Sequence, residues 1–454
     1  MRLNRRTRMA VAVATVLSVL AVAGPAPGEG PARASSGDPS LAGPSPGWTP
    51  IPGSRLADDS SDIPLIGDPF LISGVVDRHW KHEAVAAHNP NANEYLVVWA
   101  DGRNHETREL DIYGQLIAAD GTRLGPDFRI SGSFGTGDCS SPEVAFNEVN
   151  DEYLVVWQDT RALEVRGWDV YARRVSADGR RIGGDFRIGE SAGSDQRIPS
   201  VAHNRFSNRY LIVWGDDRNL TTSGWDIYGQ RLKPSGKPAG SEFRIATSSA
   251  PTDECPKAVI HNPISNRFLV VWTDAQYEWE NVYGQVLKPT GVPAGDDFRI
   301  NGAPIDTGMT RPAVALNEVR NQYLVAWTSG GDQAPEWRVE GRRIKASGKL
   351  AGDPIDINLS IPAQREQPAV SHDPSTDRYL AVWLALDQVV YGRHLRATGR
   401  PTGDAFPISD PAVTYREQWP RVTGNPIDGR HLVFWITPSL DGPPMDLYGR
   451  LVAG

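Results

Sequence analysis

The chain has 454 residues, of which 39% are apolar and 22% are charged, and its formal net charge is −8. With 14 tryptophans and 13 tyrosines it can bury a large core, which argues against global disorder. Basic residues gather only at the extreme N-terminus, so binding to nucleic acid has no electrostatic support.

The first 23 residues are typical of an export signal. A basic start precedes an apolar run from Met9 to Val22, and Ala21-Val22-Ala23 matches a small-x-small cleavage site. This run is shorter than the roughly 20 residues that span a bilayer, so we expect cleavage rather than a stable membrane anchor. Residues 24–62 are rich in Gly, Pro and Ser and are expected to form a flexible linker, which leaves residues 63–454 for the folded domain. We therefore predict a secreted, extracellular and monomeric protein.

A repeat of 52–58 residues fills the rest of the chain, and each unit aligns on one tryptophan. The seven aligned residues are Trp99, Trp157, Trp214, Trp272, Trp327, Trp383 and Trp435. Each ends an apolar run such as Tyr95–Trp99, which is typical of a strand covered on both faces. Three further strand-like segments recur in the units. The repeat predicts an all-β, seven-bladed β-propeller with four-stranded antiparallel blades.

The two ends of the repeat predict how the ring closes. The seventh unit stops at Leu451-Val452, after its third strand. Residues 67–73 lie upstream of the first full unit, yet they match the fourth-strand motif. We expect Pro69–Ser73 to pair antiparallel with Asp446–Val452, with Phe70 in the core. This N-terminal strand would complete the last blade and remove an exposed sheet edge.

The repeat also carries a recognisable signature. It reads Tyr-Leu-Val-Val-Trp-x-Asp-x-Arg, then Asp-Ile-Tyr-Gly-Gln, a glycine turn and Phe-Arg-Ile. This signature resembles the repeats of bacterial exported propeller proteins of largely uncharacterised function, over residues 67–454. The resemblance implies the fold and carries almost no chemistry.

Two sets of polar residues follow the repeat. The Asp and Arg of the signature are Asp101 with Arg103, Asp159 with Arg161, and Asp216 with Arg218. They form either a ring of charges for an anionic or metal-bridged ligand or, as we favour, ion pairs that position the loops. Four histidines share one position at the end of the first strand, where two other units have Phe146 and Leu316, and are predicted to serve packing. They are His88, His203, His261 and His372.

The remaining candidates fall on the channel face, where the first strands begin and the second strands end, and all but Asp101 and Arg103 are proposed because they break the repeat or lie beside residues that do. Long, variable loops on a rigid scaffold are where binding and catalysis concentrate. The candidate catalytic residues are His79, His82, His105, Tyr415 and Arg416. The candidate ligand-binding residues are Trp80, Glu83, Asp101, Arg103 and Trp419.

These residues support two functions. The first is a recognition module that binds an extracellular carbohydrate or protein partner through the channel face. The alternative is a carbohydrate-active enzyme, a polysaccharide lyase or glycosidase, in which His, Tyr and Arg handle the proton and the substrate charge while aromatic rings stack on sugars. No cofactor is predicted. Zinc on His79, His82 and His105, or calcium on acidic loops, stays open.

Two cysteines complete the inventory of candidate groups. Cys139 and Cys255 lie in the loops that lead into blades two and four. A disulfide requires their Cα atoms to approach within about 7 Å, and blade three intervenes. Both a bond and two free thiols are compatible with the sequence.

Overall fold

The computed structural model describes the chain over residues 64–74, 79–106, 109–132, 137–189, 193–246, 253–276, 279–302, 312–330, 337–359, 361, 368–410, 418–439 and 442–454. Residues 64–454 form one compact unit. The expected export signal and linker lie outside the described residues. Within the described part of the chain, no helix is long and apolar enough to cross a membrane.

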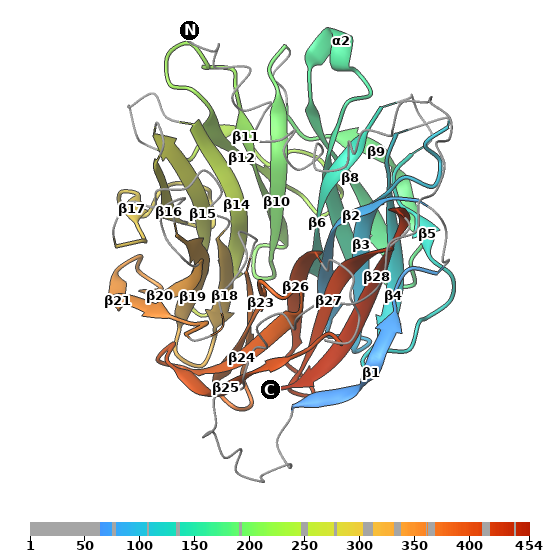
Figure 1. Cartoon of the computed structure of the whole chain (residues 1–454). Helices are drawn as coiled ribbons and strands as arrows, with labels where there is room; N and C mark the ends of the chain where they lie inside the picture. Colours follow the sequence, from blue (N-terminus) through green and yellow to red (C-terminus); the bar gives the residue numbers. More distant parts are fainter. Residues whose placement is uncertain are drawn as a thin grey trace, which may run out of the picture. The chain divides into compact units, whose positions relative to one another are not determined.

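The unit consists of seven four-stranded antiparallel sheets, the blades of a propeller (Figure 1). Blade one contains β2 (Lys81–Asn89), β3 (Glu94–Asp101), β4 (Asp111–Ala118) and β5 (Phe128–Arg129). Blade two contains β6 (Cys139–Asn147), β7 (Glu152–Asp159), β8 (Asp169–Ser176) and β9 (Arg181–Arg187), with the short α2 (Leu163–Arg166) in a loop. Blade three contains β10 (Gln196–Asn204), β11 (Arg209–Asp216), β12 (Asp226–Leu232) and β13 (Phe243–Arg244). Blade four contains β14 (Asp253–Asn262), β15 (Arg267–Gln276), β16 (Trp279–Leu287) and β17 (Phe298–Arg299).

The remaining blades follow the same order. Blade five contains β18 (Ala313–Asn317), β19 (Gln322–Ser329), β20 (Arg338–Lys345) and β21 (Leu350–Asp356). Blade six contains β22 (Ala369–Asp373), β23 (Arg378–Leu384), β24 (Val390–Arg396) and β25 (Pro401–Pro407). Blade seven contains β26 (Gln418–Asn425), β27 (Arg430–Ser439), β28 (Gly442–Ala453) and, from the other end of the chain, β1 (Leu65–Leu71). The seven-bladed propeller predicted from the repeat is confirmed.

The blades pack face to face around a ring of first strands. Each first strand contacts the first strands of both neighbouring blades, and β26 contacts β2 to complete the circle. The second strand of each blade has no solvent-exposed side, because a neighbouring blade covers each face. Trp157 of blade two, for example, packs against Leu96 and Val98 of blade one. This burial explains why the runs that end in tryptophan show no polar alternation.

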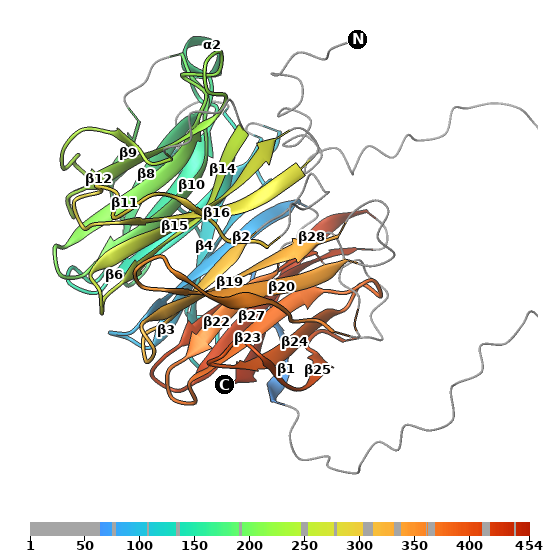
Figure 2. The same ribbon diagram turned by 90° about the vertical axis from the view of Figure 1, so that its left-hand side faces the viewer.

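The ring closes through the N-terminal strand, as predicted. In Figure 1 and again in Figure 2, β1 lies beside the C-terminal strands. β1 pairs antiparallel with β28, with Phe70 opposite Gly449, and the Ile72 N–H donates to the Leu447 carbonyl at 2.8 Å. Ile72 is fully buried, whereas Phe70 is half-buried and packs on the edge of the core shared by blades seven and one.

Glycines make room for the fourth strands within and between blades. A Cβ at Gly449 would lie 2.8 Å from Ile72 Cδ1, within blade seven. A Cβ at Gly121, a turn residue with φ of 89°, would lie 2.7 Å from Phe70 Cε1, across the closing seam. These approaches are too short for a side chain, so both positions favour glycine. The donated strand therefore contacts its own blade and the next one as the other fourth strands do.

A ladder of asparagines joins the blades on the face opposite the channel face. The Asn147 side chain accepts hydrogen bonds from the turn after its strand and donates Nδ2–H to Asn208 of blade three at 3.0 Å. At the closing seam Asn425 donates to Asn93 at 2.7 Å. The same bond joins Asn204 to Asn266, Asn262 to Asn321 and Asn317 to Asp377.

The four histidines that share a repeat position belong to this ladder. His203 Nε2 lies 3.2 Å from Asn208 Oδ1, and its ring packs on Tyr210 with 5.1 Å between centroids. His88, His261 and His372 make the equivalent contacts. Burial lowers the pKa of His203, so it packs as a neutral ring. The prediction that these histidines serve packing is confirmed.

Removing the donated strand is expected to destabilise the whole ring. A protein that lacks residues 1–75 should unfold at a clearly lower temperature than one that lacks residues 1–60, because it loses the burial of Ile72 and reopens the edge of β28. The cost should be about 3 kcal/mol or more, since an isoleucine truncated in a core alone costs about 2–5 kcal/mol. Thermal unfolding followed by circular dichroism measures it. Equal melting temperatures for the two truncations would contradict ring closure by β1.

Candidate functional site

The first strands of blades one to four and seven carry β-bulges where they begin, on the channel face. In blade one the pairing register shifts between His82 and Val85, and Glu83 within the bulge has a φ of 50°. The same left-handed backbone recurs within the bulges of Ser141, Ile198 and Trp419. Residues other than glycine seldom adopt this conformation. Bulges often change the direction of side chains beside functional sites. The bulge therefore sets the direction in which the Glu83 side chain leaves its strand.

Two glutamates from blades one and two form the charged centre of the site. The Glu83 carboxylate reaches blade two, where Oε2 accepts a 2.6 Å hydrogen bond from the Ser141 backbone N–H. Glu143 lies two residues further along β6. Glu143 is half-buried. Burial raises the pKa of Glu143 to about 7; the Arg421 guanidinium opposes this rise and the Glu83 carboxylate adds to it.

A third carboxyl group lies beside this pair. Asp138 precedes β6 and is 8% exposed, and its backbone exchanges hydrogen bonds with Thr160. Burial raises the pKa of Asp138 to about 7, and the charges of Glu109 and Glu83 add to the rise. The Glu83 carboxylate thus influences two neighbouring acids, both of which carry a proton part of the time at neutral pH.

Glu143 and Arg421 both place a charge at a repeat position that is uncharged in the other blades. They occupy one position of the first strand, just after the bulge. Across blades one to seven that position holds Val85, Glu143, Ser200, Ala258, Ala313, Ala369 and Arg421. Only blades two and seven, which flank blade one, place a charge there. Sequence reasoning did not single out these two residues, although the departure from small residues at a fixed repeat position was a usable signal.

The structure brings His82 of blade one together with Trp419 of blade seven. The ring of His82 lies 5.6 Å from that of Trp419 and 5.9 Å from that of Trp80, between centroids. His82 is 6% exposed, and its Nε2 has no hydrogen-bond partner among the described residues. Burial lowers the pKa of His82, although the charges of Glu83 and Asp101 act in the opposite direction. Both tryptophans keep part of their surface in solvent.

The other predicted catalytic residues are less well placed. His79 and His105 lie near each other, with 5.4 Å between ring centroids, and His105 is exposed. Over the described ranges, no group of three or more His, Cys, Asp or Glu is arranged to hold a metal ion. Tyr415 and Arg416 lie outside the described residues.

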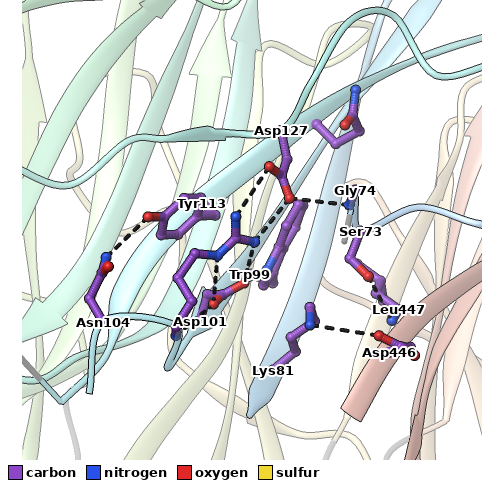
Figure 3. Close-up of polar contacts among 12 residues, drawn as sticks. Ser73, Gly74, Lys81, Trp99, Asp101, Asn104, Tyr113, Asp127, Asp446 and Leu447 are labelled. Carbon is purple, nitrogen blue, oxygen red and sulfur yellow. Dashed lines mark hydrogen bonds and ion pairs between the residues drawn. The ribbon is translucent and has the colours of Figure 1, made fainter. Parts of the chain in front are cut away.

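The Asp and Arg of the signature form an internal ion pair, which we call the arginine clamp (Figure 3). Asp101 is fully buried; its Oδ2 accepts hydrogen bonds from Trp99 Nε1 at 2.8 Å and from Arg103 Nη2 at 2.7 Å. Arg103 also binds Asp127 at 2.9 Å and lies 4.0 Å above the ring of Tyr113. The interpretation as loop-positioning ion pairs is confirmed, and the geometry gives Asp101 and Arg103 a structural role.

The same clamp recurs in the next two blades. In blade two Arg161 joins Asp159 and Asp185 over Tyr171, and in blade three Arg218 joins Asp216 and Glu242 over Tyr228. Burial favours neutral Asp216, but its bonds with Arg218 prevail and lower the pKa of this carboxyl. Each clamp therefore fixes a charged pair inside the protein.

A buried lysine marks the seam between blades one and seven. Lys81, at the start of β2, is fully buried, and its Nζ lies 3.7 Å from Asp446 Oδ1 of β28 (Figure 3). An unpaired buried ammonium group would be costly, so this ion pair ties the first blade to the last. The sequence did not reveal this ion pair, because the two residues lie more than 360 positions apart.

The two cysteines are free, so the disulfide considered from the sequence is not formed. Cys139 Sγ donates to Asp159 Oδ2 at 3.2 Å within blade two, and Cys255 Sγ accepts from Lys257 Nζ at 3.0 Å within blade four. Each cysteine sits in the first strand of its own blade, with blade three between them. Burial raises the pKa of the Cys139 thiol, and the neighbouring Asp159 adds to the rise.

Comparison with known proteins identifies the fold. No protein-family model and no curated protein matches this chain. Among solved structures it is similar to the GH93 α-L-arabinofuranosidase of Fusarium graminearum in complex with arabinobiose, with 10% identity and a TM-score of 0.50 over 85% of this chain and 98% of that chain. It is also similar to the α-L-arabinanase of Penicillium chrysogenum complexed with arabinobiose, with 12% identity and a TM-score of 0.48 over 84% of this chain and 97% of that one. At such low identity the likeness to the Fusarium graminearum enzyme shows the propeller fold alone.

Breaking one clamp should destabilise the protein through the carboxylate left behind. Arg218→Met leaves Asp216 buried without its cation, which should cost about 3 kcal/mol or more. The double variant Asp216→Asn with Arg218→Met should recover part of that loss. Urea unfolding of the three proteins measures both effects. A single variant as stable as the unmodified protein would rule out a structural role for the clamp.

Glu143 should make stability depend on pH. Its pKa is about 7 in the folded protein and near 4.5 in an unfolded chain, so the folded state holds the extra proton between these values. Stability is therefore expected to fall as pH rises from 5 to 8, and Glu143→Gln should remove this part of the fall. The difference in melting temperature, variant minus unmodified protein, should rise over that range. Glu148→Gln, at an exposed glutamate of the same blade, is the control and should show no such trend.

Proposed function

We propose that this protein is a carbohydrate-active propeller with a glycosidase-type site at Glu83 and Glu143. The observation that carries the proposal is the Glu143 carboxyl, whose pKa of about 7 is set by burial and by the adjacent Glu83 and Arg421. Glycoside hydrolysis commonly requires one carboxylic acid that is protonated at the working pH and a second carboxylate beside it. Two glutamates with different surroundings meet this requirement.

The surroundings suggest a role for each glutamate. Glu143 would act as the general acid and protonate the oxygen of the leaving sugar. Glu83 would act at the anomeric carbon, directly or through a water molecule, because the 2.6 Å hydrogen bond from the Ser141 N–H fixes the position of its carboxylate beside Glu143. Arg421 opposes full protonation of Glu143 and is expected to set the pH at which the acid works.

Aromatic side chains beside the glutamates suit a sugar ligand. Trp80 and Trp419 are half-buried and flank His82, so part of each ring is open to stack on a pyranose or furanose. The Fusarium graminearum enzyme, a propeller of similar fold, is an α-L-arabinofuranosidase complexed with arabinobiose. Arabinose-containing oligosaccharides are therefore the first substrates to test, together with sialosides and uronate-containing polysaccharides.

The same aromatic group also suits a second function, recognition of a glycan without turnover. His82 and the two tryptophans form a contact surface that needs no proton transfer. The lyase considered from the sequence would use His79, His82 or His105 for proton transfer, with Tyr415 and Arg416, which lie outside the described residues. The carboxyl pair is what supports hydrolysis. Secretion stays part of the proposal and rests on the N-terminal sequence alone.

Kinetic measurements separate these functions. On a substrate that is turned over, Glu143→Gln and Glu83→Gln should each reduce kcat roughly 100-fold or more, whereas Glu148→Gln should not. Activity should fall as pH rises through about 7, because Glu143 loses the proton it donates. Trp419→Ala should weaken binding by about 1 kcal/mol. Glycan binding without turnover would replace the glycosidase with a recognition module, and neither binding nor turnover on any of these glycans would overturn the proposal.

A further inference from the structure

Two sets of hairpins form the face of the ring opposite the channel face, which we call the hairpin face. The inner hairpins join the first strand of each blade to the second, and the outer hairpins join the third strand to the fourth in blades one to six. In blade three, Tyr210 near the start of β11 lies opposite both His203 near the end of β10 and Leu232 at the end of β12. Both hairpins of a blade therefore leave the sheet at the same end.

Basic side chains gather on this face in blades three to six. The four inner hairpins there are residues 205–209, 263–267, 318–322 and 374–378, and the four outer hairpins are residues 233–237, 288–292, 345–349 and 396–400. These eight hairpins, which we call the basic sector, contain twelve lysines and arginines and two acids, Glu318 and Asp377. The sector therefore has a formal charge of +10, whereas the whole chain has −8. The sequence does not show it as a basic run, because the hairpins are spread over residues 205–400.

The equivalent hairpins of blades seven, one and two have the opposite balance of charge. Residues 426–430, 90–94, 148–152, 118–122 and 176–180 contain seven acids and two arginines. The hairpin face is therefore positive on one side of the ring and negative on the other. Such an asymmetry would orient the ring against a charged surface.

The lysines of the outer hairpins are open to a partner from outside the chain. All five are exposed, and among the described residues none of them forms an ion pair: Lys233, Lys237, Lys288, Lys345 and Lys349. By contrast, Arg320 of an inner hairpin is partly neutralised by Asp377 at 2.7 Å. An anionic surface attracts exposed cationic groups of this kind.

Apolar side chains project between these cations. Phe206, Ile264 and Val319 occupy one position of the inner hairpins, two residues after the ladder asparagine, and are 56–59% exposed. Val292 of an outer hairpin is 52% exposed. A single exposed apolar residue is ordinary on a protein surface. Three of them at equivalent positions of neighbouring blades make the basic sector both apolar and cationic.

This combination distinguishes between anionic partners. A soluble polyanion needs the cations alone and would leave the apolar side chains in water. A bilayer with anionic lipid has phosphate groups at its surface and hydrocarbon just beneath them, so it contacts both kinds of side chain. The basic sector is therefore better suited to a lipid surface.

We propose that the basic sector binds the surface of a bilayer that contains anionic lipid. The lysines and arginines would lie at the headgroup phosphates, while Phe206, Ile264 and Val319 enter the boundary between headgroups and hydrocarbon. The contact is peripheral and reversible, because only side chains at the tips of hairpins enter the lipid. The acidic hairpins of blades seven, one and two would be repelled by the same surface and tilt away from it.

This orientation leaves the candidate site accessible. Glu83 and Glu143 lie on the channel face, at the opposite end of their strands from the hairpins. With the basic sector on lipid, the channel face points away from the bilayer. The proposal uses no residue of the glycosidase-type site and holds whichever function that site has.

Co-sedimentation with vesicles tests the proposal. The protein used is residues 61–454, which contain the whole compact unit and lack the apolar N-terminal run that would itself favour lipid. The vesicles are phosphatidylcholine alone or equal parts of phosphatidylcholine and phosphatidylglycerol, and heparin serves as the soluble polyanion. The protein should bind the anionic vesicles about tenfold or more tightly than the neutral ones. Binding should weaken as salt rises from about 0.1 M to about 1 M, since the Debye length falls from about 10 Å to about 3 Å.

Charge reversal locates the binding. Lys345→Glu with Lys349→Glu should weaken binding to anionic vesicles about tenfold or more. Arg299→Glu with Arg338→Glu changes the net charge equally, at exposed residues where β17 ends and β20 begins, near the channel face. This control should change binding less than about twofold, because its charges lie far from the lipid and are screened.

A second pair of variants tests the apolar contact. Phe206→Ser with Ile264→Ser should weaken binding to anionic vesicles about tenfold and leave binding to heparin unchanged, because only lipid takes up apolar side chains. Val149→Ser with Ile427→Ser changes the same repeat position in blades two and seven, outside the basic sector, and should leave vesicle binding unchanged. All four side chains are exposed, so the variants are expected to fold, and circular dichroism checks this.

The proposal fails on any of three results. The first is no binding of the unmodified protein to anionic vesicles. The second is an equal loss of binding when Lys345 and Lys349 are reversed and when Arg299 and Arg338 are reversed. The third is binding to heparin together with vesicle binding that Phe206→Ser with Ile264→Ser does not weaken, which would make the basic sector a site for a soluble polyanion.

Discussion

Every second strand of this protein has to be covered on both faces, and only a closed ring covers all seven. The run from Tyr95 to Trp99 is fully buried because blade seven covers one face of the strand and blade two covers the other. If the ring opened at any seam, two such apolar faces would meet water. The hydrophobic effect that stabilises each blade therefore depends on the pairing of β1 with β28.

Closure also creates the candidate site. Arg421 and Trp419 lie more than 330 residues from Glu83 and His82 in the sequence, and they come together only because blade seven is the neighbour of blade one. The buried Lys81–Asp446 pair lies at this same seam. The charged groups of the site thus come from blade one and from the two blades that flank it, and Glu143 and Arg421 replace the uncharged residues that other blades have at the same repeat position. A scaffold position that is Ala or Ser in four blades can hold Glu143 or Arg421 because the strand itself is fixed by its neighbours.

The fold was predictable because each blade repeats the same physical solution. The strand that ends in tryptophan, the glycine turn and the Phe-Arg-Ile strand recur along the chain in the same order. Residues 67–73 match the last of these segments, and this match predicted that the N-terminal strand closes the ring. The site was less predictable, because it depends on distances between blades. Sequence reasoning found His82, Glu83 and Trp419 as departures from the repeat, but missed Glu143, whose pKa depends on burial and on a charge in another blade. It also placed the Asp101–Arg103 pair among the ligand-binding residues, where the structure shows an internal ion pair.

The closing seam is built from the same contacts as the other seams. Phe70 lies against Gly121 as Phe128 lies against Gly179, and Asn425 donates to Asn93 as Asn147 donates to Asn208. In addition to these shared contacts, the Lys81–Asp446 ion pair crosses the closing seam. Because the Phe–Gly and Asn–Asn contacts repeat at other seams, the ring does not depend on which blade comes first in the sequence. A circularly permuted gene with its ends at another blade boundary is expected to encode the same ring.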